Sequence, residues 1–386
     1  MVEQQKNTLI SQIESLIDSG EIEKAKENVI EILKILPDDE HFLYQLSNIE
    51  FMLGNCHKAV YILKSIKSFE LTELIERAIS EYLMYAHRNA IEEKLLTVAY
   101  IVKNEEKHLP ESLRSIQSIA DEIIVVDTGS TDNTVRIAED FGAKVYHFNW
   151  ANDYSAARNV SIMHATGKWV LYLDADEVIQ NSDLLSIVNS LKRSDVKVGG
   201  FIFEIISKYY NDYGKESTHS GRYPRLFRNL GYPIIYFFGK VHEQISTSLI
   251  EKGYEMKESN FKILHMGYAI SQTEMSLKLS KRLKILTDHV VEEPTNGYAW
   301  YHAGNTFFQM KMYQETIQFL ENALKCKNLS PYLSANTCLI ISKSYEAVGD
   351  LKSALHYSTL SGNYLSNYRP ALDRSNYLMG LLLNKI

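Results

Sequence analysis

Residues 96–179 read LTVAYIVKNEEKHLPESLRSIQSIADEIIVVDTGSTDNTVRIAEDFGAKVYHFNWANDYSAARNVSIMHATGKWVLYLDADEVI. Within this stretch, short apolar runs alternate with helical patterns. The runs are Leu96–Val102, Glu122–Val126, Lys144–Phe148 and Trp169–Leu173. Near-continuous apolar strands, each followed by a helix, indicate a parallel sheet that is covered on both faces. The sequence therefore predicts an α/β domain built on a mostly parallel sheet.

Acidic side chains stand where these runs end. Glu105 follows the first run, Asp127 ends the second, and Asp174 and Asp176 follow the fourth. Ligands of such sheets bind outside the carboxyl ends of the strands. Several carboxylates there would repel a bare phosphate, but Mg²⁺ and Mn²⁺ prefer oxygen ligands and keep substrate phosphates in their remaining positions. The sequence therefore predicts a nucleoside diphosphate held together with a divalent metal.

Four motifs occur in order along the stretch: VKNEE, VVDTGSTDNT, FNWANDYSAARN and LDADE. In this order they resemble the nucleotide-sugar half of the inverting family 2 glycosyltransferases of the GT-A fold, with weaker matches as far as His265. One Asp-X-Asp motif occurs by chance in many proteins, so the order of the four motifs carries the resemblance. It implies transfer of a hexose or N-acetylhexosamine from a UDP-sugar, with inversion, helped by Mg²⁺ or Mn²⁺.

The resemblance also implies roles for the last two motifs. Asp176 is expected to bind the metal, and Asp174 is expected to face the ribose or the metal. Arg158 is expected to hold the nucleotide, with Asp153 beside it or on the base. The alternatives are a helix-capping role for the Asp-X-Asp residues and an internal Arg–Asp pair that staples the helix.

The first two motifs are expected to contact the nucleoside. The resemblance gives Asp127 the uracil N–H or the ribose, and its alternative role is to close the turn that follows it. Glu105 is a further candidate for the nucleoside, with an exposed charge as the alternative.

A second group of motifs, RYPRLFRN and FGKVHEQI, lies downstream. Inverting transfer needs a general base for the acceptor proton, and Glu243 lies in the half where the family places it. A salt bridge to Arg222 or Arg225 is the alternative for Glu243. Either His242 or His265 could complete the metal shell; the segment ILHMGY resembles the HNGY-like segment of peptide S-glycosyltransferases and favours His265. A packed core histidine is the alternative.

The region that contains these motifs, Gly199–Lys262, is predicted to be rich in β-strands. The expected strands are Gly200–Ser207, Tyr223–Arg228, Ile234–Phe238 and His242–Thr247. Between the first two lies Lys208–Gly221, a polar and aromatic segment that we expect to be a long loop. The resemblance implies that this loop is part of the acceptor wall or lid, and a mobile connector is the alternative.

Helical repeats are predicted on both sides of the domain. Gly20 and Gly54, and likewise Ala25 and Ala59, are 34 residues apart, which is the period of tetratricopeptide (TPR) repeats. A charged helix, Leu71–Asn89, then leads into the first strand. After residue 271, the TPR pattern is matched by Trp300, Ala303, Gly304, Phe307, Leu320 and Ala354. We expect TPR-like repeats at 1–90, a GT-A domain at 91–270 and TPR-like repeats at 271–386; an unrelated helical bundle is the alternative for the first.

Composition limits the partners. The net charge of −7 argues against nucleic acid. No apolar run is long enough for a membrane span and the start of the chain has no signal-peptide core, so the cytoplasm is the expected location.

The acceptor is expected to be a peptide or protein. The layout resembles the glycocin S-glycosyltransferases of the sublancin type, which attach sugar to Cys, sometimes Ser, of a ribosomally made peptide. The N-terminal repeats depart from that layout and put this acceptor in doubt. A cell-envelope glycan or another protein is the alternative acceptor, and a catalytically inactive TPR scaffold is the alternative function. The repeats are also candidates for pairing two subunits.

Overall fold

The structure is a computed structural model that describes residues 3–66, 75–82, 94–210, 216–266, 272–365 and 368–383. The chain divides into two compact units. The first, here called the sheet unit, comprises Met1–Ala151, Ala156–Phe238 and Gln244–Ala269. The second, the repeat unit, comprises Asn152–Ser155, Gly239–Glu243 and Ile270–Ile386. The division into three domains made from the sequence stays a prediction.

The described part of the sheet unit contains an eight-stranded sheet with the order β3-β2-β1-β4-β7-β6-β8-β5. The strands are β1 (Leu96–Val102), β2 (Glu122–Asp127), β3 (Lys144–His147), β4 (Trp169–Leu173), β5 (Glu177–Ile179), β6 (Val198–Tyr210), β7 (Glu216–Arg228) and β8 (Glu255–His265). Strands β3, β2, β1 and β4 pair in parallel, as predicted. The other half is mixed, because β7 runs antiparallel to both β4 and β6, and β5 runs antiparallel to β8.

Both faces of the parallel half are buried, because alternate residues of a strand point to opposite faces. Ala99 and Val170 pack into one core with α8 (Tyr154–His164). Val98 and Leu171 pack into a second core with α6 (Leu109–Ile116) and α9 (Asn181–Arg193). Helix α7 (Thr134–Asp140) also contributes to the second core. This double burial confirms the α/β fold class.

Two predicted strands are wrong. Residues 234–238 and 242–247 form only an isolated bridge between Phe238 and Gln244, followed by helix α10 (Ser246–Glu251). The backbone N–H and C=O of Phe237 bond instead to the amide side chain of Asn159. The apolar character of this segment reflects burial in the first core rather than strand pairing, since Ile234, Ile235 and Phe237 all lie there.

The predicted loop at Lys208–Gly221 is also corrected. Strands β6 and β7 extend far beyond their predicted ends and pair as one long hairpin as far as Tyr210 and Glu216. Residues 211–215 of the predicted loop lie outside the described residues. Strands β5 and β8 were not predicted, because β5 has three residues and β8 carries an irregular polar pattern.

The N-terminal helices form the predicted pairs. They are α1 (Glu3–Asp18), α2 (Ile22–Ile35), α3 (Glu40–Met52) and α4 (Cys56–Ser65). Gly20 and Gly54 each have φ of +80° in the turn inside a pair, a conformation that suits glycine. Ala25 and Ala59 are fully buried, one in the second helix of each pair. Most of the helix predicted at Leu71–Asn89 lies outside the described residues. The part that is described, residues 75–82, is helical.

A buried charged cluster, Lys26, Glu50 and Lys58, joins these helices to α8. Lys26 Nζ lies 3.0 Å from Glu50 Oε1 and donates to the carbonyl of Met163 at 3.0 Å. Lys58 Nζ donates to the carbonyl of Ile162 at 3.3 Å. The last carbonyls of a helix lack partners within it and attract cations. Burial lowers the pKa of Lys58 to about 8, although Glu50 favours its charged form.

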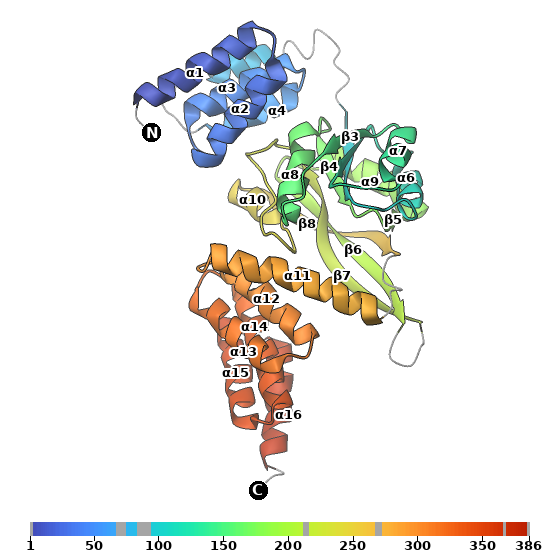
Figure 1. The fold of residues 1–386 in the computed structure, drawn as a ribbon, viewed down its shortest axis with the longest axis vertical. Helices are drawn as coiled ribbons and strands as arrows, with labels where there is room; N and C mark the ends of the chain where they lie inside the picture. Colours follow the sequence, from blue (N-terminus) through green and yellow to red (C-terminus); the bar gives the residue numbers. More distant parts are fainter. Residues whose placement is uncertain are drawn as a thin grey trace. The chain divides into compact units, whose positions relative to one another are not determined.

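The repeat unit contains helices α11 (Gln272–Glu292), α12 (Gly297–Gln309), α13 (Tyr313–Lys325), α14 (Pro331–Ala347), α15 (Leu351–Tyr364) and α16 (Arg369–Leu383), drawn in orange to red in Figure 1. Helices α12 and α13 approach closely where the repeat pattern predicts, because a Cβ on Gly304 would lie 2.5 Å from Leu320 Cδ2. Among the helices in the described ranges, none is long and apolar enough to cross a lipid bilayer.

Candidate functional site

The loops after β1 and β2 are tied to each other at the carboxyl edge of the sheet. Asn104 has φ of 57°, and its side-chain oxygen accepts the N–H of Thr131 at 2.7 Å. The N–H of Glu105 donates to Thr134 Oγ1 at 2.7 Å. Asparagine tolerates the left-handed region better than most residues. These bonds bring Glu105 beside the turn that follows Asp127.

Asp127 is the last residue of β2 and is buried. Its carboxylate accepts the N–H groups of Gly129 at 3.1 Å and Ser130 at 3.0 Å, and lies 3.4 Å from His147 Nδ1. Asp127 therefore closes its own turn, the alternative role considered from the sequence. A carboxylate has about four acceptor positions, so turn closure and a nucleoside contact are compatible, and the nucleoside role stays a prediction.

Asp174 lies between two buried arginines. Arg158 Nη2 donates to Asp174 Oδ1 at 2.6 Å, and Arg225 Nη2 lies 3.5 Å from Oδ2. The side chains of Arg158 and Arg225 are 5% and 10% exposed, whereas that of Asp174 is 40% exposed. Both guanidinium carbons lie over the ring of Tyr172, at 4.5 and 4.6 Å from its centroid. The guanidinium groups of Arg158 and Arg225, both stacked on Tyr172, thus hold the partly exposed carboxylate of Asp174 in place.

The charges of these arginines decide the ionisation of Asp174. Burial alone would raise the pKa of Asp174, but Arg225 and Arg158 outweigh it and hold that pKa well below its usual range. Arg158 reaches from α8 to the end of β4, so its bond to Asp174 lies outside its own helix.

Glu177 completes this cluster, and sequence analysis did not single it out. Arg225 Nη2 donates to Glu177 Oε1 at 2.6 Å, and the N–H of Asp174 donates to Glu177 Oε2 at 3.0 Å. Burial raises the pKa of Glu177 to about 7, against the effect of Arg225. The signal was present in the sequence, because Glu177 is the last residue of LDADE, yet only the fold brings Arg225 to it. Arg222 pairs elsewhere, with Glu258.

Asp176 and His265 form a pair of metal-ligand type. Asp176 Oδ2 lies 3.0 Å from His265 Nε2, and Ser207 Oγ lies 3.2 Å from His265 Nδ1. The antiparallel pairing of β5 with β8 creates this contact, since it sets Glu177 opposite His265. Burial would lower the pKa of His265, but the hydrogen bond and charge of Asp176 outweigh it and raise that pKa. Residues 267–268 of the HMGY segment lie outside the described residues.

The remaining candidates belong to the repeat unit. Asp153 lies in Asn152–Ser155, just before α8, and His242 and Glu243 lie in Gly239–Glu243. The structure therefore brings Asp174, Asp176 and His265 together with Arg158 in the sheet unit, while Asp153 and Glu243 are described with the other unit.

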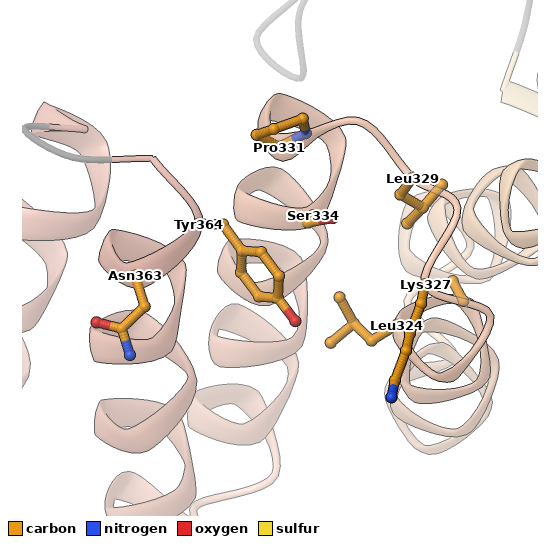
Figure 2. Close-up of a pocket in the computed structure, with 8 residues that line it drawn as sticks. Leu324, Lys327, Leu329, Pro331, Ser334, Asn363 and Tyr364 are labelled. Carbon is orange, nitrogen blue, oxygen red and sulfur yellow. The ribbon is translucent and has the colours of Figure 1, made fainter.

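A cavity of about 270 Å³ is also present in the repeat unit. It lies among α13, α14 and α15, and Figure 2 shows Asn363 and Tyr364 on one side of it and Leu324, Leu329 and Lys327 on the other. None of the residues predicted to act on the donor or metal lines this cavity. It is therefore separate from the strand-end cluster.

Comparison with known proteins now identifies the domain. Residues 97–247 match the model of glycosyl transferase family 2. Residues 97–247 are a family 2 glycosyltransferase domain. The match spans β1 to β7 and the cluster around Asp174, and it confirms the family resemblance found in the four motifs.

Relatives of known sequence extend the similarity beyond the family 2 domain. The chain is 29% identical over 273 residues to a TPR repeat-containing protein of Synechococcus elongatus, covering 67% of this chain and 64% of that protein. It is 29% identical over 231 residues to the SPbeta prophage-derived glycosyltransferase SunS of Bacillus subtilis, covering 59% of this chain and 53% of SunS. The chain thus spans less than two thirds of the length of either relative.

Solved structures resemble the chain more distantly. Staphylococcus aureus TarS 1–349 is 16% identical with a TM-score of 0.38, over 76% of this chain and 92% of that one. Glucosyl-3-phosphoglycerate synthase from Mycobacterium tuberculosis, solved with Mn²⁺ and UDP-glucose, is 17% identical with a TM-score of 0.36, over 52% and 79%.

Proposed function

We propose that this chain is an inverting, metal-dependent glycosyltransferase that moves a hexose or N-acetylhexosamine from a UDP-sugar to Cys or Ser of a ribosomally synthesised peptide. One observation carries the donor half of the proposal. An accessible Asp174 held by two buried arginines stands beside the Asp176–His265 pair, at the strand ends of a family 2 domain.

The cluster around Asp174 suits the nucleotide of the donor. Arg158 and Arg225 leave Asp174 ionised, so its partly exposed carboxylate can accept a hydrogen bond from a ribose hydroxyl. The same arginines supply positive charge for a diphosphate. Asp127 and Glu105 remain the proposed nucleoside contacts, since the tied loops hold them at the same edge of the sheet.

The Asp176–His265 pair fits a divalent metal. Two ligands in adjacent octahedral positions, each about 2.1 Å from Mg²⁺, lie about 3 Å apart, and the two donor atoms are 3.0 Å apart. No group of three or more His, Cys, Asp or Glu side chains arranged to hold a metal occurs in the described ranges. The proposal therefore needs the substrate phosphates to complete the coordination of the ion. A bound metal would supply charge stabilisation for the departing UDP. Ser207 would orient the imidazole of His265 through its other nitrogen.

The acceptor half of the proposal rests on resemblance. The similarity to SunS and the GKVHE and HMGY segments support a peptide acceptor. Glu243 is the proposed general base, taking the acceptor proton as the oxygen or sulfur attacks the anomeric carbon. Transfer to an envelope glycan or another protein uses the same donor chemistry and differs only in the acceptor.

The test is intact-mass analysis of a peptide containing Cys and Ser, incubated with the full chain, Mn²⁺ and a panel of UDP-sugars. The expected result is a gain of one hexose or N-acetylhexosamine that Asp176→Asn abolishes and Asp140→Asn, a change at an exposed site, does not. UDP release without a mass gain would overturn the peptide acceptor and keep the donor chemistry. Absence of UDP release from every donor would overturn both.

A further inference from the structure

The segment Gly239–Glu243, which carries the proposed base, is held by other parts of the repeat unit. Its first residues bond to the start of α8, because the carbonyl of Gly239 accepts Ser155 Oγ at 2.6 Å and that of Lys240 accepts the N–H of Tyr154 at 3.0 Å. The side chain of Lys240 forms an ion pair with Glu292 at the end of α11. The segment is therefore fixed at its N-terminal end.

The middle of the segment packs on α11 and α12. Val241 is buried in a small apolar core that belongs wholly to the repeat unit. The other buried members of this core are Leu286, Val290, Ala299 and Ala303. A Cβ on Gly239, whose φ is +88°, would lie 3.2 Å from the ring of Tyr298. The segment therefore follows the surface of α12 closely.

His242, the neighbour of Glu243, is fixed by two residues of α12. Tyr298 donates its hydroxyl to the carbonyl of His242 at 2.6 Å, and the ring of His302 stacks on that of His242 with centroids 4.4 Å apart. His242 has φ of 57°, an uncommon conformation for a residue with a side chain. Such a conformation persists only where the surroundings over-determine it.

Burying the ring of His302 costs folding free energy, because the ring carries two polar nitrogens. Both of its ring nitrogens are buried and have no hydrogen-bond partner within the described residues. A buried polar atom without a partner is destabilising by roughly 1–3 kcal/mol. An aliphatic residue would avoid that cost but would give up the ring stacked on His242.

We infer that Tyr298 and His302 are positioning residues for the general base. They hold His242 in its left-handed conformation, and this sets the direction in which the chain presents Glu243. Helix α12 thereby acts on the proposed base through contacts that lie within the repeat unit. The inference rests on the proposed role of Glu243.

The first experiment measures hydrogen exchange of residues 240–243 in the full chain. Tyr298→Phe removes one hydroxyl and is expected to speed exchange there about tenfold, the effect of losing one hydrogen bond. Tyr332→Phe, an exposed position on α14, serves as the matched control and is expected to change nothing. Unaltered hydrogen exchange at residues 240–243 in Tyr298→Phe would overturn the inference that the Tyr298 hydroxyl fixes this segment.

The second experiment measures UDP release from UDP-glucose, UDP-galactose and UDP-N-acetylglucosamine with Mn²⁺. Tyr298→Phe is expected to slow release about tenfold in the native chain, because a displaced base loses efficiency. In a Glu243→Gln background it is expected to have no further effect. Full additivity in that background would overturn the inference, whereas a native rate in Glu243→Gln itself would overturn the role of Glu243.

His302 provides a second and independent variant. His302→Phe keeps a ring on His242 and is expected to retain most of the rate, while His302→Ala is expected to lose about as much as Tyr298→Phe. An unchanged affinity for UDP in both variants would separate positioning of the base from damage to the donor site. Equal loss in both His302 variants would contradict positioning by stacking.

Discussion

At the scale of single residues, the proposed base should matter more for one acceptor atom than for another. A cysteine thiol ionises near pH 8.5, so a fraction of it is already thiolate near neutrality, whereas a serine hydroxyl is not. Glu243→Gln is therefore expected to slow transfer to Ser about 100-fold and transfer to Cys about tenfold or less. Initial rates on two peptides that differ only in Cys or Ser measure this, with Glu251→Gln as the control. An equal loss on both peptides would refute it.

Arg225 and Glu177 should behave as one energetic pair. Arg225→Met leaves the buried Glu177 carboxylate without its 2.6 Å partner and is expected to lower the free energy of unfolding by about 3 kcal/mol. In a double variant with Glu177→Gln the loss should fall short of the sum by about 1–3 kcal/mol. Urea unfolding of the full chain measures the cycle. Arg222→Met removes an exposed pair and should cost under about 1 kcal/mol; additive losses at Arg225 and Glu177 would contradict the prediction.

At the scale of elements, the carboxylate of Glu122 links the parallel strands at their amino-terminal ends. Glu122 begins β2 and its side chain is 1% exposed. It accepts hydrogen bonds from Thr97 at 2.7 Å, the N–H of Thr166 at 2.8 Å, Lys144 at 2.9 Å and Lys94 at 3.0 Å. It therefore joins β1, β3 and the turn before β4. Burial would raise the pKa of Glu122, but these hydrogen bonds outweigh it and lower that pKa to about 2.

The depressed pKa of Glu122 predicts how its contribution depends on pH. The side-chain pKa of glutamate in the unfolded chain is about 4.3, so the unfolded state binds the proton first as pH falls. The stabilisation is therefore complete above about pH 5 and is lost between about pH 4.3 and pH 2. Glu122→Gln should lower the free energy of unfolding by about 2 kcal/mol at pH 7, and the deficit should shrink in that window. Urea titrations at pH 7, 4 and 3 test this; a deficit that stays constant to pH 3 would be inconsistent with it.

The sequence predicted the elements whose pattern is local and missed those that depend on distant partners. Strands β1 and β4 match their predicted bounds, because continuous apolar runs need only burial on both faces. The three residues of β5 become a strand only through pairing with β8. The same pairing sets His265 beside Asp176, so a motif supplied the candidate and only the fold supplied the contact. The contact between Arg225 and Glu177 was likewise not predicted, because the two residues are 48 positions apart and only the fold brings them together.

At the scale of the whole molecule, the N-terminal helices and the sheet share one apolar core and should unfold together. Phe42 and Leu46 of α3 lie in the same core as Val170 of β4. Glu50, whose side chain is 2% exposed, pairs with Lys26 in the charged cluster at the end of α8. Glu50→Gln leaves two buried lysines without their carboxylate and is expected to cost about 3 kcal/mol. The exposed pair at Glu31 offers the same substitution as a control, worth under about 1 kcal/mol.

Fluorescence of Trp169, which lies in the sheet rather than in the N-terminal helices, tests this prediction. Trp169 of β4 is buried, and replacing Trp150 and Trp300 with Phe leaves it as the sole tryptophan. If the shared core makes one cooperative unit, Glu50→Gln in α3 shifts the urea midpoint reported by Trp169 fluorescence as much as the midpoint reported by far-UV circular dichroism. An unmoved Trp169 transition with an earlier loss of helical signal would mean that the N-terminal helices unfold alone. The family 2 domain would then keep its donor site without them, and the lysine contacts to Ile162 and Met163 would serve only to dock the helices.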